Sequence, residues 1–389
     1  MLSSAAMSET PDLITTTDAL AETVARLRER DWFALDTEFI REDTYWPQLC
    51  LIQVATDEHL ACIDPLALAD LEPFYALLAD PAVTKVLHAA DQDLEVFHLA
   101  TGRLPAPVFD TQLAAPLLGF PEQAGYGRLV EALLDVRLTK GHARTDWRER
   151  PLPEPALRYA ADDVRYLVPL YEALRAGLAA RERLGWLEEE FARLTDAARY
   201  ERAPEDAWHR LKGIDRLSGP GRSVIRALAR WREQEARNAN VPRGRILRDE
   251  ALVDLARALP ADRKQLGRLR SLRGRPLERY GADLLTLIEE AREQTPPELR
   301  TTPTLGPELD ERGQALAEAL HAVVHLRCAE HAVNPEIVVS RRDLGRIAGG
   351  EAASAILGGW RSDLVATDLD AFMAGRQSLR HDETGLQLG

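Results

Sequence analysis

Two acidic residues, Asp36 and Glu38, lie within an otherwise largely apolar stretch at residues 32–39. Because side chains alternate along a β-strand, residues at i and i+2 project from the same face. Two carboxylates so close together repel each other and lose solvation when buried, and a divalent cation relieves both effects. The pair therefore indicates a metal site. The alternative is an exposed strand end whose acids simply meet water.

Two further acidic motifs follow along the chain. In residues 88–97 a strand pattern gives way to a helical one, and capping explains Asp91 there, because helix N-termini favour carboxylates. Asp93 lies further into the helix, so capping does not explain the presence of an acidic residue there. Tyr159 and Asp163 are four residues apart in a helical pattern, so their side chains face the same side. An ordinary surface hydrogen bond is the alternative for that pair.

Four other polar residues accompany these motifs. His88 lies on an apolar strand, where we expect a structural hydrogen bond rather than a catalytic role. Lys140, His142 and Arg144 precede the Tyr159 helix in a segment that resembles a loop. They are candidates for contact with substrate phosphates, and solvated loop charge is an equal alternative.

The elements that would position these residues follow from apolar periodicity. Strands are expected at 32–39, 51–55, 60–63 and 84–88, and helices from Gln92 and at 111–118, 125–135 and 154–183. Beyond Leu194 no strand is predicted, and helices are expected near 205–216, 221–238, 249–259, 262–271 and 278–294. Linkers at 199–204 and 295–303 divide the chain into residues 1–200, a mixed α/β domain, and two all-helical domains at 201–295 and 305–389. A faint repeat relates the segments after Pro242 and Pro335.

Charge is distributed unevenly among these domains. The net charge is −14, yet residues 211–279 hold 18 Lys and Arg against 8 Asp and Glu. Such a surplus favours phosphate binding, with a solvated helical face as the alternative. No run approaches the roughly 18 consecutive apolar residues of a membrane span. The three cysteines form no Cys-x-x-Cys pair, so we expect buried thiols, a cytoplasmic location and no disulfides. No obligate protein partner is evident.

Taken together, the acidic motifs resemble the DEDD exonuclease superfamily in its tyrosine-bearing branch, and within it the ribonuclease D family. The similarity extends over nearly the whole chain and includes Leu35-Asp-Thr-Glu-Phe39, Tyr45-Trp-Pro-Gln-Leu49, His88-Ala89, Asp110-Thr-Gln112, Arg144-Thr-Asp-Trp147 and Arg150-Pro-Leu152. The resemblance implies a ribonuclease H-like domain that degrades RNA from its 3′ end, including transfer RNA precursors. It also implies a catalytic set of Asp36, Glu38, Asp93, Tyr159 and Asp163.

The helical half resembles the helicase-and-ribonuclease-D C-terminal (HRDC) domain, an auxiliary nucleic-acid binder. The matching positions are Ala229-Arg-Trp231-Arg232, Val241-Pro242, Ile246-Leu-Arg-Asp249 and Leu252. Because the basic surplus coincides with this domain, candidate RNA contacts are Arg230, Arg232, Arg243 and Arg245. A second, divergent HRDC-like domain is expected at 305–389. It lacks the surplus, so we expect it to pack or position rather than bind RNA.

The chemistry implied is two-metal phosphodiester hydrolysis, with cations roughly 3.5–4 Å apart. Asp36 would bridge the two ions, Glu38 and Asp163 would hold the ion that activates water, and Asp93 would complete the outer shell. Oxygen ligands without His or Cys favour Mg²⁺ or Mn²⁺. Tyr159 would orient the attacking water, because its usual pKa near 10 makes it a poor base. A DNA 3′→5′ exonuclease and a lapsed nuclease kept as an RNA-binding scaffold are the rival readings.

Overall fold

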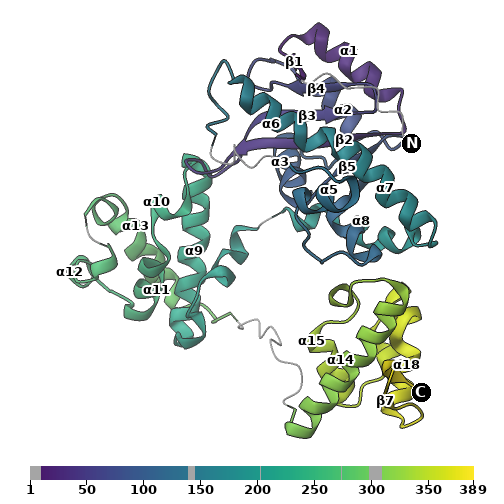
Figure 1. Cartoon of the computed structure of the whole chain (residues 1–389). Coiled ribbons are helices and arrows are strands. Elements are labelled where there is room, and N and C mark those ends of the chain that lie inside the picture. Colours follow the sequence, from purple (N-terminus) through teal and green to yellow (C-terminus); the bar gives the residue numbers. More distant parts are fainter. Residues whose placement is uncertain (1–9, 139–144, 202, 273, 298–308) are drawn as a thin grey trace.

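The computed structural model describes residues 10–138, 145–201, 203–272, 274–297 and 309–389. These residues form an α/β unit followed by two helical units (Figure 1). In the described ranges, no helix combines the length and apolarity that crossing a bilayer would require.

A six-stranded mixed sheet forms the centre of the α/β unit, in the order β1-β4-β3-β2-β5-β6. Strand β2 pairs with β3 in antiparallel and with β5 in parallel orientation, and β6 and β1 are parallel edge strands. The strands are β1 (Asp12–Ile14), β2 (Trp32–Ile40), β3 (Gln48–Ala55), β4 (Leu60–Ile63), β5 (Thr84–Leu87) and β6 (Val108–Asp110). The four longer strands match the prediction, whereas the two edge strands, of three residues each, were not predicted.

Helices cover both faces of this sheet. Leu35 of β2 lies in a core with α1 (Thr17–Arg28), α2 (Glu72–Leu78) and α3 (Asp91–Thr101). Ala34, on the other face, lies in a core with α7 (Leu167–Ala179), and α6 (Glu154–Arg165) crosses β2, β3 and β4. The unit also contains α4 (Thr111–Ala114), α5 (Tyr126–Leu134) and α8 (Glu188–Leu194). The prediction of a mixed sheet flanked by helices is confirmed.

The single helix predicted at 154–183 is divided in two. Helix α6 ends at Arg165 and α7 begins at Leu167, with Tyr166 between them. Pro169 explains the break, because its ring clashes with the carbonyl group four residues earlier, that of Arg165, and it has no N–H to donate. The division leaves α6 free to lie across the sheet at its own angle.

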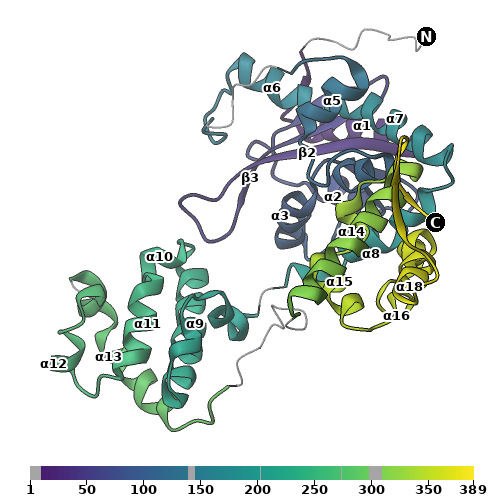
Figure 2. The same ribbon diagram turned by 60° about the horizontal axis from the view of Figure 1, so that its bottom comes forward.

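The first helical unit has its own apolar core, centred on Leu228, Leu252 and Leu284. Its helices are α9 (Gly219–Ala239), α10 (Arg243–Ile246), α11 (Asp249–Ala258), α12 (Arg263–Leu266) and α13 (Arg275–Arg292), and the predicted helix at 205–216 forms the 3₁₀ turns η4 (Pro204–Arg210) and η5 (Ile214–Arg216). The loop between β2 and β3 reaches this unit from the sheet (Figure 2).

The C-terminal unit packs directly on the α/β unit. Leu320 and Leu344 belong to the same core cluster as Leu117 and Leu187, and Trp360 stacks on Trp186 with ring centroids 4.7 Å apart. Its helices are α14 (Glu311–His331), α15 (Arg341–Ala348), α16 (Ala353–Ile356), α17 (Gly359–Arg361) and α18 (Thr367–Met373), with a π-helical turn at Ser362–Ala366 before α18. The predicted absence of strands beyond Leu194 is wrong, because β7 (Leu379–Asp382) and β8 (Gly385–Leu388) form a hairpin.

Candidate active site

Strand β2 presents Asp36 and Glu38 towards α6. Asp36 is opposite Gln53 and Glu38 is opposite Leu51 in the antiparallel pairing with β3, and a bulge follows directly after Glu38. Ala34, on the same face, is fully buried in the core beneath α7, whereas both acids keep part of their surface exposed. The strand therefore leaves the apolar core just where its acidic residues begin.

Asp93 lies in the first turn of α3 and is almost fully buried. The hydroxyl of Thr37, between the two acids of β2, donates a hydrogen bond to the Asp93 carboxylate. Asp110 fixes the turn that leads into α3, because its carboxylate accepts hydrogen bonds from the backbone N–H groups of Ala89 and Ala90 at 3.1 and 2.8 Å. Thr37 and Asp110 were not predicted as site residues. Thr37 lies between two acidic residues and Asp110 lies at the end of an apolar strand, and these positions could have indicated that both residues support the site.

Helix α6 brings Asp163 and Tyr159 to the same place. The charge of Asp163 raises the pKa of Asp36, of Glu38 and of Tyr159, which places these groups close to one another. The Tyr159 ring lies beside Trp147, with centroids 6.5 Å apart. The structure thus brings together all five predicted catalytic residues, from β2, α3 and α6.

Burial raises the pKa of every acid in this group, and neighbouring carboxylates raise it further. Loss of solvation is the largest cause for each; it raises the pKa of Glu38 to about 8 and those of Asp93 and Asp163 to about 7. The pKa of Asp36 is raised well above its usual value, first by burial and then by Asp93, Asp163 and Glu38. Burial and the neighbouring acids also raise the pKa of Tyr159 to about 12, so the phenol keeps its proton at neutral pH.

The donor chemistry of this centre fits divalent cations. Within the described ranges, no three His, Cys, Asp or Glu side chains already stand as a set of metal ligands. Four neighbouring carboxylates that are removed from water would nevertheless gain from a positive charge among them, and a donor set of oxygens alone suits a hard cation. Asp36, Glu38, Asp93 and Asp163 are the residues that would hold such ions.

The other predicted residues lie elsewhere. His88 hydrogen-bonds Thr111 through Nδ1 at 2.9 Å, and burial lowers its pKa to about 4, so it is a neutral structural group as expected. Lys140, His142 and Arg144 lie outside the described residues.

The predicted RNA-contacting arginines of the first helical unit all have protein partners. Arg230 pairs with Glu205, and Arg245 pairs with Asp43. Arg243 forms two contacts with the Glu233 carboxylate. Arg232 is 4% exposed and binds the Leu247 carbonyl at 2.9 Å and Asp249 at 2.6 Å, so it holds the unit together rather than facing solvent.

Comparison with known proteins places this geometry in a family. Residues 11–179 match the 3′–5′ exonuclease family model, and residues 222–288 match that of the HRDC domain. The chain is 42% identical to ribonuclease D of Acidiphilium cryptum, over 95% of this chain and 94% of that protein. It is 40% identical to ribonuclease D of Gluconacetobacter diazotrophicus, over 96% and 95% of the two chains. The chain belongs to the ribonuclease D family.

A solved structure agrees with this assignment. The crystal structure of Escherichia coli RNase D, described as an exoribonuclease involved in structured RNA processing, superposes with a TM-score of 0.76 at 35% identity and covers 94% of this chain and 99% of that one. Like its ribonuclease D relatives, this protein is a 3′→5′ exoribonuclease. A DNA-specific enzyme and a lapsed scaffold are therefore disfavoured.

The raised pKa of Glu38 makes the stability of the metal-free fold depend on pH. A carboxyl group whose pKa rises from 4.5 to about 8 on folding favours its protonated form, so the metal-free fold loses stability as pH rises across that window. Glu38→Gln removes the ionisable group and should raise the free energy of unfolding at pH 8 by on the order of 1–3 kcal/mol. The gain should vanish near pH 4.

Urea denaturation in EDTA at both pH values measures this difference. Glu42→Gln, at an exposed neighbouring position, is the control and should leave the stability nearly unchanged at both. Equal effects of Glu38→Gln at pH 4 and pH 8 would show that repulsion among the carboxylates does not destabilise the metal-free fold.

Proposed function

We propose that Asp36, Glu38, Asp93 and Asp163 hold two divalent cations, Mg²⁺ or Mn²⁺, and that the protein removes nucleoside 5′-monophosphates from RNA 3′ ends. The observation that carries the proposal is the meeting of four mutually repelling carboxylates from β2, α3 and α6 beside one tyrosine. When bound, two cations roughly 3.5–4 Å apart activate the attacking water and neutralise charge on the phosphate and on the leaving 3′-oxygen.

Each residue has a distinct task in this proposal. Asp36 is the acid whose pKa responds to all three others, so we assign it the bridging position, with Glu38 and Asp163 on the side nearest Tyr159. Asp93, whose carboxylate accepts a hydrogen bond from Thr37, completes the outer shell of metal ligands. Tyr159 keeps its proton, with a pKa of about 12, and therefore donates a hydrogen bond that orients the attacking water instead of removing its proton.

We propose transfer RNA precursors among the substrates. The E. coli relative is described as acting in structured RNA processing, and a structured RNA needs a binding surface beyond its 3′ end. Exposed cations of the first helical unit, notably Arg263, Lys264 and Arg268, could supply that surface, in addition to the exposed Arg230 and Arg245.

We further propose functional domains at 1–200, 201–295 and 305–389, the last being a second HRDC-like domain. Both helical units contain a 21-residue helix that is followed by a left-handed residue, Asn240 with φ 47° after α9 and Ala332 with φ 50° after α14. In each unit a short proline-initiated segment and another helix follow. Packing against the α/β unit favours a positioning role for the C-terminal copy.

The proposed location is the cytoplasm, and no obligate protein partner is proposed. The three cysteines are buried and unpaired, as a reducing compartment would allow.

The proposed division of tasks on α6 predicts two different defects. Tyr159→Phe removes one hydrogen bond to water and should slow cleavage by about 10²–10⁴ with almost unchanged metal binding. Asp163→Asn removes a full negative charge from the metal ligands, so Mn²⁺ affinity and turnover should fall together, with only partial rescue by excess Mn²⁺. Calorimetric Mn²⁺ titration and single-turnover cleavage of RNA labelled at its 5′ end measure both.

Asp162→Asn provides a matched control, because Asp162 pairs with Arg165 beside the site. It should bind Mn²⁺ and cleave nearly as the wild type does. The assignment is wrong if Tyr159→Phe cleaves at the wild-type rate, or if Asp163→Asn binds two Mn²⁺ ions as tightly as the wild type.

The proposed basic surface predicts a change in salt dependence. Replacing Arg263, Lys264 and Arg268 with Gln should lower affinity for structured RNA and make the slope of log K against log salt shallower by up to about 2, because each phosphate contact on a single strand contributes about 0.7. Filter binding over a salt series measures the slope. The control replaces Arg312, Arg342 and Arg380 of the C-terminal unit, which are also exposed. Equal slopes for the two triple variants would refute the assignment of phosphate binding to the first helical unit.

A further inference from the structure

The loop that joins β2 to β3 anchors the α/β unit to the first helical unit. The Tyr45 hydroxyl donates to the buried Glu233 and accepts from Arg237 at 3.0 Å and Arg243 at 3.3 Å. The Asn240 side chain accepts hydrogen bonds from the backbone N–H groups of Tyr45 and Trp46, each at 3.1 Å. The backbone of Trp46 is thereby fixed, while none of these bonds uses its indole ring.

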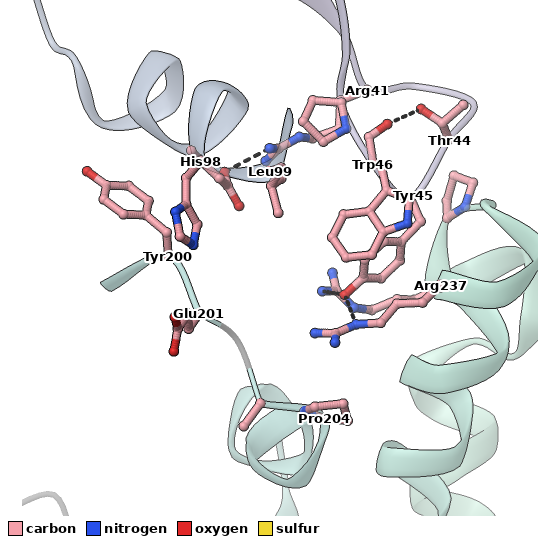
Figure 3. A pocket seen from close by; sticks show the side chains of 15 residues that line it. Arg41, Thr44, Tyr45, Trp46, His98, Leu99, Tyr200, Glu201, Pro204 and Arg237 are labelled. Carbon is pink, nitrogen blue, oxygen red and sulfur yellow. Dashed lines mark hydrogen bonds and ion pairs between the residues drawn. The ribbon is translucent and has the colours of Figure 1, made fainter. Parts of the chain in front are cut away.

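A cavity of about 550 Å³ lies beside this anchor. Its walls come from the β2–β3 loop, from α3, from α9, from the start of α10, and from Tyr200, Glu201, Ala203 and Pro204. Trp46 and Arg237 stand on one side and His98, Leu99 and Tyr200 on the other (Figure 3). The cavity is therefore built jointly by the catalytic unit and the HRDC unit.

The lining combines aromatic and polar side chains. Trp46 is partly exposed, and Leu99 is 37% exposed. The polar side chains of the lining include Thr44, His98 and Glu201. An aromatic face beside hydrogen-bonding groups is the chemistry that recognises a nucleobase, which stacks through its face and forms hydrogen bonds along its edge.

The charges around the cavity nearly balance. Arg41 pairs with Glu95 at 2.7 Å, Arg237 and Arg243 line the cavity together with Glu201, and Glu233 lies behind the two arginines of the helical unit. Such a site would hold a strand by stacking more than by attraction to phosphate, so the affinity that it contributes should depend little on salt.

The position of the cavity connects it to the candidate active site. His98 and Leu99 follow Asp93 on α3 by five and six residues, which is about 8–9 Å along the helix axis. The loop with Trp46 continues directly from β2, which carries Asp36 and Glu38. The catalytic unit and the HRDC unit meet at this junction.

We propose that the cavity is a subsite for one unpaired nucleotide of the RNA substrate, upstream of the 3′ end, with its base stacked on Trp46. The proposal rests on the exoribonuclease function proposed above. It assigns Trp46 to binding longer RNA and leaves hydrolysis to the carboxylate centre.

The test uses the full-length chain and two unstructured, 5′-labelled RNAs, a dinucleotide and a longer oligonucleotide. Fluorescence anisotropy in EDTA measures binding without hydrolysis. Trp46→Ala should weaken binding of the longer RNA by about 5- to 100-fold, as expected for the loss of one base–aromatic stack, and by the same factor at low and high salt. Trp46→Phe should restore most of the affinity. Leu66→Ala, at an exposed apolar residue outside the cavity lining, is the control and should bind as the wild type does.

Dinucleotide cleavage with Mn²⁺ separates this inference from the proposed function. Trp46→Ala should cleave the dinucleotide at the wild-type rate, whereas a wild-type chain that cleaves no RNA would refute the proposed function itself. The subsite is refuted if Trp46→Ala binds the longer RNA normally, or if it impairs the dinucleotide as much as the longer RNA. Binding of free 5′-AMP as tight as that of the longer RNA would instead assign the cavity to a mononucleotide. A change in small-angle scattering of Trp46→Ala would assign the ring to domain anchoring, which also refutes the subsite.

Discussion

Electrostatic repulsion among Asp36, Glu38, Asp93 and Asp163 is the constraint on which the rest of this structure depends. In the folded chain the acids are partly or fully removed from water, and each is easier to protonate than it would be in an unfolded chain. No packing among these side chains offsets that effect. Stability must come from the two apolar cores on either side of the sheet, and cations would convert the repulsion into attraction.

The surrounding elements hold this unfavourable arrangement in place. Strand β2 lies between β3 and β5 in the sheet; its first residues pair with β5, and its acidic residues pair with β3. Thr37 binds Asp93, and Asp110 fixes the turn before α3. The C-terminal unit shares a core with the α/β unit, whereas the first helical unit has a core of its own and is anchored through the loop that continues from β2. The catalytic unit and the HRDC unit are thus in contact through one strand and its loop.

Much of the α/β unit could be predicted from the sequence, because long strands such as 32–39 and 51–55 carry strong apolar patterns. The edge strands β1 and β6 are too short for a period to emerge, and β7 and β8 are largely exposed, with little apolar signal. The predicted helix at 154–183 overlooked the effect of Pro169. The missed strands have a common cause, since local periodicity reports burial on one face and not the contacts made by distant segments.

The meeting of the candidate catalytic residues was predictable for a different reason. No sequence spacing shows that Asp36, Asp93 and Asp163 meet in space, and it was the resemblance of three motifs in order that predicted it. Charge alone was a poorer guide to RNA contacts. Arg232 and Arg243 look like free cations in the sequence, yet in the fold they pair with Asp249 and Glu233, because a helical unit rich in arginine uses several of them to bind its own carboxylates and carbonyl groups.

We propose that the four carboxylates form one centre that holds two cations. A crystal of the full chain with Mn²⁺ and a non-hydrolysable RNA, measured near the manganese absorption edge, tests it most directly. We expect two anomalous peaks roughly 3.5–4 Å apart, with Asp36 bound to both ions. A single peak, or peaks bound by other residues while RNA occupies the site, would contradict the claim.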